Sequence, residues 1–266
     1  MESEIRDGDK KNDKMSVLNK FMLLAMISTL LLSFRSPPKK IKVYLIGDST
    51  MSVKQKRYYP ETGWGMPFAG FFDAEVEVDN RAQNGRSTKS FINEKRWQSV
   101  MDSLNEDDYV FIQFGHNDEV ETKKNYTKPE EFKANLIRFI TDTKAKKATP
   151  ILLSPVSRRR FDVGGKAQET HPYTYLVKEV ASEQKVAFID LDARSIALYQ
   201  KFGPDASTLL FNHLEPGIHP NYPEGKIDDT HFNELGAREI AQLVLQELRK
   251  LNLDLSNHIV KPQPKK

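Results

Sequence analysis

Along residues 41–191, short runs of mainly apolar residues alternate with longer segments in which apolar positions recur every three or four residues. Short apolar runs bounded by polar residues indicate buried strands. We predict five strands, at residues 42–46, 75–78, 109–114, 151–153 and 187–191. Strands that alternate with helices in this way form a parallel sheet with helices on both of its faces.

Two longer segments have the 3.6-residue period of an amphipathic helix. In residues 135–147, the apolar face consists of Leu136, Phe139 and Ile140. In residues 233–250, the apolar face consists of Ala237, Ile240, Leu243, Val244 and Leu248. Asn233 is a suitable N-cap for this last helix. The glycine- and proline-rich residues 203–225 predict a long loop, and long ordered loops in compact domains are usually functional.

This organisation predicts one α/β domain, a three-layer α/β/α sandwich around a five-stranded parallel sheet. The sequence contains no internal repeat and no second domain boundary. Residues 36–40 are predicted to be a linker, because prolines and lysines in succession continue neither a helix nor a sheet. We place the domain at residues 41–256 and a basic tail at residues 257–266.

Residues 21–34 are the one strongly apolar, uncharged stretch of the chain. A membrane-spanning helix needs about 20 such residues, so this stretch fits the apolar region of a secretory signal peptide better. The long segment of mixed charge before it and Arg35 after it also fit a signal anchor. We therefore predict a signal peptide or signal anchor within residues 1–35. The domain is then secreted or periplasmic, or held at the membrane if this segment is not cleaved.

The composition excludes several classes of function. The chain of 266 residues has 40 basic and 37 acidic side chains and a net charge of +3, without the clustered basic face that nucleic-acid binding needs. It contains no cysteine. Disulfides, thiolate metal sites and a cysteine nucleophile are therefore excluded. The histidine spacings also do not match a metal-binding motif.

Small polar residues stand where the predicted strands end. Ser49 follows the first strand, and in open α/β sheets ligands bind beyond the carboxyl ends of strands, so Ser49 is either a helix N-cap or a nucleophile. Gly85 in an Asn-Gly turn follows the second strand, and Asn117 follows the third. Taken singly, Gly85 is an ordinary turn residue and Asn117 an ordinary loop residue.

Asp228 and His231 precede the last predicted helix and are three residues apart. In a helical or tight-turn segment this spacing puts both side chains on one side. The carboxylate can then accept from Nδ1–H of His231 and leave Nε2 free as a base. Asp229 is the alternative partner, but its spacing points the two side chains apart. Considered alone, this histidine is more often a helix-capping residue.

The segments GDST, NGRST, GHND and DDTH occur in this order on these elements, and together they resemble the SGNH (GDSL-type) esterase and lipase family. The resemblance spans roughly residues 41–250 and implies a flavodoxin-like fold. It implies that Ser49 is the nucleophile, that His231 is its base and that Asp228 orients His231. It also implies an oxyanion hole made by the N–H groups of Ser49 and Gly85 and the side chain of Asn117. No metal or organic cofactor is implied, and Asp48 is interpreted as structural.

Within the family, the chain looks most like the rhamnogalacturonan acetylesterases, through NRAQNGRSTKSF, QFGHND, SPVSRRRF, THPY and HPNYPEGKIDDTHFNELGA. The resemblance implies an acetylated pectic polysaccharide or oligosaccharide as substrate. Arg158 and Arg160 are candidate contacts of a uronate carboxylate, because arginine binds carboxylates in a bidentate manner. His171 and His219 are candidates for lining the site, with Tyr173 or Tyr222 beside them.

Three alternatives remain at this point. An acetylxylan or other oligosaccharide deacetylase would use the same residues on a neutral sugar chain. A lipolytic esterase would need an apolar acyl tunnel, which the loops rich in Arg, His, Asn and Tyr do not favour. A carbohydrate-binding protein without activity would have no need of Ser49, Gly85, Asn117, Asp228 and His231 together.

Overall fold

The computed structural model of the protein describes residues 40–261. The predicted signal segment, most of the predicted linker and the end of the basic tail lie outside these residues, so these three remain predictions. None of the helices within residues 40–261 combines the length and the apolar character that crossing a membrane requires.

Five parallel strands form one sheet in the order β2-β1-β3-β4-β5. They are β1 (Ile41–Gly47), β2 (Val76–Asn80), β3 (Tyr109–Gln113), β4 (Thr149–Leu153) and β5 (Ala187–Ile189). All five predicted strands are present, and no end differs by more than two residues from the expected one. β5 ends early because Asp190 caps the following helix by accepting from the backbone N–H of Ala193.

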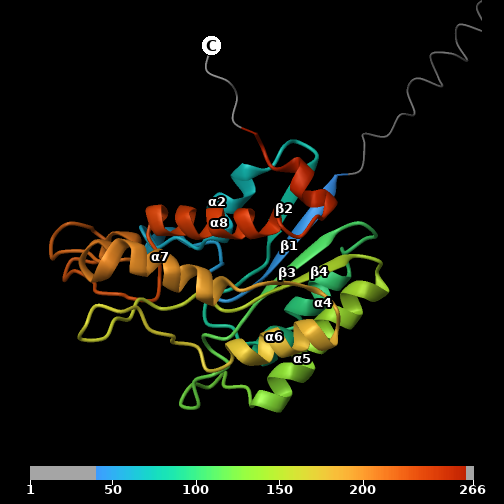
Figure 1. Cartoon of the computed structure of the whole chain (residues 1–266), viewed down its shortest axis with the longest axis horizontal. Coiled ribbons are helices and arrows are strands. Elements are labelled where there is room, and N and C mark those ends of the chain that lie inside the picture. Colours follow the sequence, from blue (N-terminus) through green and yellow to red (C-terminus); the bar gives the residue numbers. More distant parts are fainter. Residues whose placement is uncertain (1–39, 262–266) are drawn as a thin grey trace, which may run out of the picture. The chain divides into compact units, whose positions relative to one another are not determined.

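Helices cover both faces of the sheet, as predicted, and Figure 1 shows the two layers. One layer contains α2 (Gly65–Phe68), α7 (Leu191–Ala206) and α8 (Glu234–Leu248), with the 3-10 helices η2 (Ala69–Phe71), η3 (Ser207–Leu210) and η4 (Asp254–His258). The other contains α3 (Thr88–Asn93), α4 (Arg96–Met101), α5 (Pro129–Ala145) and α6 (Thr174–Glu183). The short helix η1 (Lys56–Tyr58) lies in the loop after β1.

The two faces of β1 contribute to two separate cores. Val43 and Leu45 of β1 pack with α2, α7 and α8, whereas Tyr44 and Ile46 pack with α3 to α6. This alternation follows from the two-residue period of a strand. A strand that is buried on both faces consists mainly of apolar residues. Polar residues that could bind or react with a ligand are therefore expected beyond its end.

Three boundaries differ from the prediction. Residues 203–225 are not all loop, because α7 continues to Ala206 across a non-helical Gly203 and η3 follows. α5 begins at Pro129, a residue well suited to the first helical turn, and not at residue 135. The fold also extends past residue 256, since Ile259 is buried and pairs with Phe72.

The first prediction concerns the close approach of α8 to η3. A Cβ on Gly236 would lie 1.9 Å from the carbonyl oxygen of Leu210, so Gly236→Ala has to move the start of α8. Overpacking of this kind lowers the free energy of unfolding by about 1–3 kcal/mol. Urea denaturation measures it. Gly70→Ala is the control, because no atom lies within 4 Å of its added Cβ, and equal stabilities for both variants would contradict the prediction.

Candidate active site

The segments that follow β1, β2 and β3 emerge at one edge of the sheet, because these strands are parallel and adjacent. Ser49 lies two residues after β1, Gly85 lies in the turn after β2, and Asn117 follows β3. The loop between η3 and α8 brings His231 to the same edge, where its ring reaches Ser49. Residues far apart in the sequence therefore meet at the carboxyl ends of the strands, as expected for this kind of sheet.

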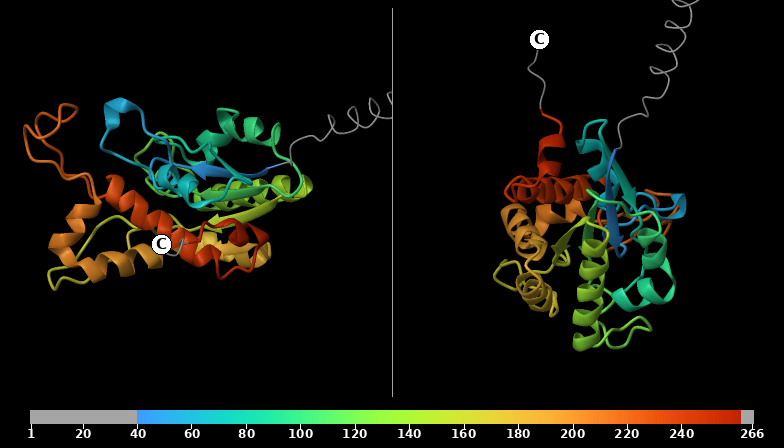
Figure 2. Two further views of the ribbon diagram at one scale, coloured as in Figure 1. Left: turned by 90° about the horizontal axis from the view of Figure 1, so that it is seen from above. Right: turned by 90° about the vertical axis from the view of Figure 1, so that its right-hand side faces the viewer.

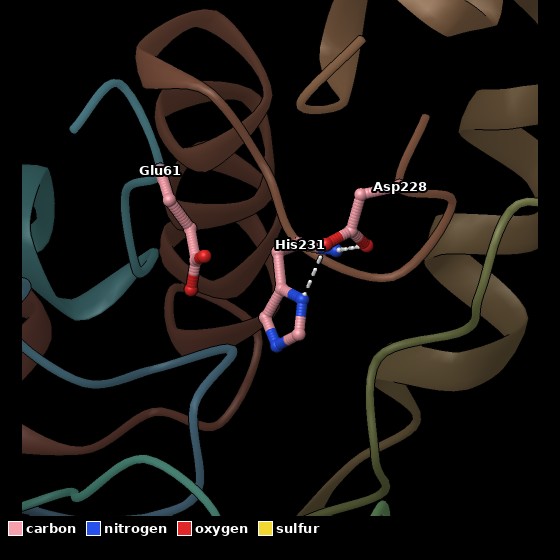
Figure 3. Close-up of side chains that lie close together, drawn as sticks. All are labelled: Glu61, Asp228 and His231. Atoms are coloured by element: carbon pink, nitrogen blue, oxygen red, sulfur yellow. Dashed lines mark hydrogen bonds and ion pairs between the residues drawn. The ribbon is translucent and has the colours of Figure 1, made fainter. Parts of the chain in front are cut away.

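Ser49, His231 and Asp228 form a continuous chain of hydrogen bonds. Nε2 of His231 lies 2.9 Å from Oγ of Ser49, and Nδ1 of His231 lies 2.9 Å from Oδ2 of Asp228. A carboxylate can only accept at this position, so Nδ1 carries the proton and Nε2 is free to accept from the serine hydroxyl. Figure 3 shows the imidazole held against Asp228.

The backbone also holds the carboxylate of Asp228. Its Oδ1 accepts from the N–H groups of Thr230 and His231, each at 2.9 Å. Burial by itself would raise the pKa of Asp228, but the facing imidazole and these hydrogen bonds keep that pKa well below its usual range. Asp228 is therefore ionised at neutral pH.

Asp229, the alternative partner, points elsewhere. Its Oδ1 lies 2.9 Å from Nη1 of Arg159 and 2.8 Å from Nε2 of His213. The adjacent carboxylates thus have different partners, and only Asp228 contacts His231 within the part of the chain that the structure describes.

Gly85 and Asn117 follow the two strands that flank β1, and each has a hydrogen-bond donor left over. Gly85 adopts a φ of 75°, in the left-handed region that favours glycine. Among residues 40–261, neither its N–H group nor that of Ser49 has an acceptor. One amide hydrogen of Asn117 is donated to the carbonyl of Arg86 at 3.0 Å, and its oxygen accepts from Lys123. The second amide hydrogen of Asn117 remains available.

Asp48 joins the turn after β1 to the turn after β3. Its Oδ1 accepts from the N–H and the hydroxyl of Thr50, and its Oδ2 accepts from Nδ1 of His116 at 3.2 Å. Burial would raise the pKa of Asp48, but His116 and Thr50 hold it well below its usual range. Burial lowers the pKa of His116 to about 4, although Asp48 opposes this shift. These contacts fit the structural role that the sequence analysis assigned to Asp48.

His171, a candidate for lining the site, is enclosed by other residues of the protein. Its side chain is 0% exposed, with Nδ1 at 2.8 Å from Glu119 and Nε2 at 2.9 Å from the carbonyl of Val156. Arg158 pairs with the same Glu119 at 3.0 Å, so its charge is already neutralised. A histidine and an arginine on a loop look like ligand contacts in a sequence, but here both compensate one buried carboxylate.

The remaining substrate candidates lie at the surface. Arg160 is exposed and has no side-chain partner among the described residues. His219 is half-buried, with its ring 5.7 Å from that of Tyr59 and 6.2 Å from that of Tyr222. Tyr173 is buried and donates to the carbonyl of Thr127, so it does not accompany His171 at the site.

The structure adds residues that no motif indicated. Glu61 lies with Asp228 and His231 in a group whose ligand atoms are all within 4.8 Å of one another, and Figure 3 shows the three side chains. Such a group could hold a cation. Two lysine ammonium groups already contact its carboxylates: Lys54 lies 2.7 Å from Glu61, and Lys226 lies 3.1 Å from Asp228. The donor set therefore fits lysine better than a metal ion.

A family model described as "GDSL-like Lipase/Acylhydrolase family" matches residues 45–238. The chain belongs to this family. The family and the parallel α/β fold expected from the sequence are thereby confirmed, as is the class of ester hydrolases.

Relatives of known name support a finer comparison. The chain is 41% identical over 229 residues to the rhamnogalacturonan acetylesterase RhgT of Bacillus subtilis, covering 85% of this chain and 97% of that protein. It is 34% identical over 224 residues to the probable rhamnogalacturonan acetylesterase YesY of the same organism, covering 82% and 97%.

Two solved structures have a similar fold. The crystal structure of YxiM from Bacillus subtilis superposes with a TM-score of 0.71 at 26% identity, covering 82% of this chain and 59% of that longer chain. The acetylxylan esterase Axe2 from Geobacillus stearothermophilus superposes with a TM-score of 0.57, covering 82% and 96%, at 19% identity. At 19% identity the likeness to Axe2 concerns the fold alone.

The second prediction concerns His116. Its pKa is about 4 in the fold and 6.5 when exposed, so between these values the unfolded chain binds the proton and the folded chain does not. The contribution of neutral His116 to the free energy of unfolding is therefore fully present above pH 6.5. It is lost as the pH falls toward 4, and the loss amounts to about 3 kcal/mol. His116→Asn keeps a donor for Asp48 but does not titrate. Urea denaturation at pH 7 and pH 4.5 should show a smaller loss for this variant, and an equal loss would contradict the prediction.

Proposed function

We propose that the protein is a serine carbohydrate esterase that removes acetyl groups from pectic rhamnogalacturonan, with Ser49, His231 and Asp228 as its catalytic residues. One observation carries the chemistry: the unbroken hydrogen-bonded chain from the hydroxyl of Ser49 through the imidazole to an ionised carboxylate. A serine hydroxyl is a weak nucleophile at neutral pH and becomes effective when a base takes its proton.

The reaction follows from this geometry. Oγ of Ser49 attacks the acetyl carbonyl while its proton passes to Nε2 of His231, and Asp228 stabilises the imidazolium that forms. The tetrahedral oxyanion accepts from the N–H groups of Ser49 and Gly85 and from the amide of Asn117. The bond between the acetyl carbon and the sugar oxygen then breaks, and His231 gives its proton to that departing oxygen, which leaves as a sugar hydroxyl. Water attacks the acetyl-serine by the same route and releases acetate.

The relatives and the local charge support a pectic substrate. Both Bacillus subtilis relatives named above are rhamnogalacturonan acetylesterases or probable ones. A cavity of about 360 Å³ beside the Gly85 turn is lined by Val53, Lys54, Gln55, Arg57, Tyr58, Gln83, Asn84 and Arg86. A polyuronate is anionic, and arginine is the side chain best suited to its carboxylates. This cavity replaces Arg158 as the place where we expect a uronate.

The two arginines of this cavity retain positive charge. Arg57 is exposed and has no ion-pair partner among the described residues. Arg86 shares the carboxylate of Glu94 with Arg96, so two guanidinium groups face one carboxylate. The carboxylate of a bound uronate would therefore meet excess positive charge from Arg57 and Arg86, next to the Gly85 turn of the proposed oxyanion hole.

A neutral acetylated xylan is the competing substrate. The feature that favours it is the ring of Tyr59, which is 47% exposed and close to His219, because aromatic faces stack on sugars without regard to charge.

A pectic polymer would be met outside the cytoplasm, which agrees with the signal segment expected in residues 1–35.

The third prediction tests the chemistry. Ser49→Ala should lower kcat about 10⁶-fold, because it removes the nucleophile, and Asp228→Asn about 10⁴-fold, because it removes only the group that orients His231. The measurement is acetate release from acetylated rhamnogalacturonan and from acetylated xylan. Asp229→Asn is the matched control, and a larger loss in this variant than in Asp228→Asn would refute the assignment. Faster acetate release from xylan would support the assigned catalytic residues but contradict the proposed pectic substrate.

The fourth prediction tests the charged cavity. Arg57→Gln should raise KM for acetylated rhamnogalacturonan about five-fold and leave KM for acetylated xylan unchanged, because an exposed ion pair contributes about 1 kcal/mol. Arg160→Gln, another exposed arginine, is the control and should change neither value. If Arg160→Gln raised KM for the pectic substrate and Arg57→Gln did not, the uronate would bind near Arg160 and not in the cavity.

A further inference from the structure

A buried charge network surrounds the residues assigned to catalysis and has no role in the reaction as described. Its members are Lys54 from the loop after β1, Glu61 from the segment before α2, and Lys226 from the loop before α8. Two of them are almost fully buried: the side chain of Lys54 is 2% exposed and that of Glu61 is 5% exposed. Charges this deep in a protein are costly unless they are paired and hydrogen-bonded.

The ammonium group of Lys54 has three acceptors, one for each of its hydrogens. It donates to the backbone carbonyl of Ser49, to Oδ1 of Asn84 at 2.8 Å and to Glu61 at 2.7 Å. Ser49 is the proposed nucleophile, and Asn84 precedes Gly85 of the proposed oxyanion hole. Lys54 thus joins the two backbone segments whose N–H groups would bind the oxyanion.

Glu61 links Lys54 to the loop that carries Asp228. Its second oxygen lies 3.5 Å from Nζ of Lys226, whose ammonium group lies 3.1 Å from Oδ2 of Asp228. This Oδ2 is the same oxygen that accepts from Nδ1 of His231. The ring of Tyr222 packs under the ammonium group of Lys226, 4.8 Å from its centroid, and limits where that group can lie.

The contacts close a ring. They run from the carbonyl of Ser49 through Lys54, Glu61 and Lys226 to Asp228, and return through His231 to the hydroxyl of Ser49. Two carboxylates and two ammonium groups make the ring neutral when His231 is neutral. Glu61 lies between Lys54 and Lys226, so its buried carboxylate is compensated from both sides.

We propose that Lys54, Glu61 and Lys226 are positioning residues, which fix the distance between Ser49 and His231 and the place of the Gly85 turn. The inference rests on the proposed function. Lys226 also contacts Oδ2 of Asp228, the oxygen that accepts from His231, so it helps to fix the place of this carboxylate. A purely structural ion pair would not contact the backbone of Ser49, the residue before Gly85 and the carboxylate of Asp228.

The first experiment changes Lys226, with 4-nitrophenyl acetate as the substrate because it has no sugar to misplace. Lys226→Met should lower kcat at pH 7 about ten-fold with KM nearly unchanged, because Asp228 loses one of the groups that hold its carboxylate in place. Lys226→Arg should restore kcat. Lys250→Met, at an exposed ion pair with Glu247, is the control. An unchanged kcat in Lys226→Met would overturn the role proposed for Lys226.

The second experiment separates positioning from folding. Lys54→Met and Glu61→Gln each leave an unpaired buried charge or donor and should lower both stability and kcat. The double variant Lys54→Met/Glu61→Leu replaces the buried pair with apolar side chains and should recover stability. We expect its kcat to stay at least ten-fold low with KM nearly unchanged. Recovery of wild-type kcat would show that the pair only stabilises the fold.

The two proposals fail in different ways. If the wild-type protein and Ser49→Ala hydrolyse 4-nitrophenyl acetate equally slowly, the proposed function is wrong. If Ser49→Ala is inactive but the lysine and Glu61 variants behave as the wild type, the function stands and the positioning network is refuted.

Discussion

The close contact between β1 and β3 at their carboxyl ends is the constraint on which the site depends. A Cβ on Gly47 would lie 2.5 Å from the carbonyl oxygen of Gln113, so only glycine lets the two strands stay paired to this point. The side chain of Gln113 is buried, donates to the hydroxyl of Thr50 and accepts from Trp64. The turn that carries Ser49 is therefore anchored by hydrogen bonds to the sheet before any catalytic contact is made.

Paired charges then connect the loops above the sheet. Asp48 binds His116 across β1 and β3, Glu119 binds His171 and Arg158 across β3 and β4, and Asp228 binds Lys226 and His231 within one loop. Each carboxylate is compensated by a cation or an imidazole donor, so burial does not force it to take up a proton. In the proposed reaction the imidazole of His231 becomes charged, and an ionised Asp228 beside it would stabilise that charge.

Local patterns in the sequence predicted the elements, because each element depends on its own residues. Short apolar runs located all five strands, and the spacing of Asp228 and His231 located their hydrogen bond. The network of Lys54, Glu61 and Lys226 leaves no such pattern, since its partners are up to 165 residues apart. The three consecutive arginines illustrate the same limit: Arg158 pairs with Glu119, Arg159 pairs with Asp229, and only Arg160 is free among the described residues. Which partner a loop charge finds is decided by tertiary structure.

The two loops beside the site are joined to each other as well as to the catalytic residues. Asn221 donates to the carbonyls of Lys56 and Tyr59, and the hydroxyl of Tyr222 donates to the carbonyl of Tyr58. Figure 2 shows these two loops side by side. One of them carries Arg57 of the charged cavity and the other carries Lys226, which contacts Asp228. Lys54 and Glu61 pair within the first of these loops, and Glu61 also contacts Lys226 of the second. The same charges therefore connect the two loops to each other and to Asp228. Under the proposed function, the residues that bind the sugar and those that cleave its ester would be held in place together.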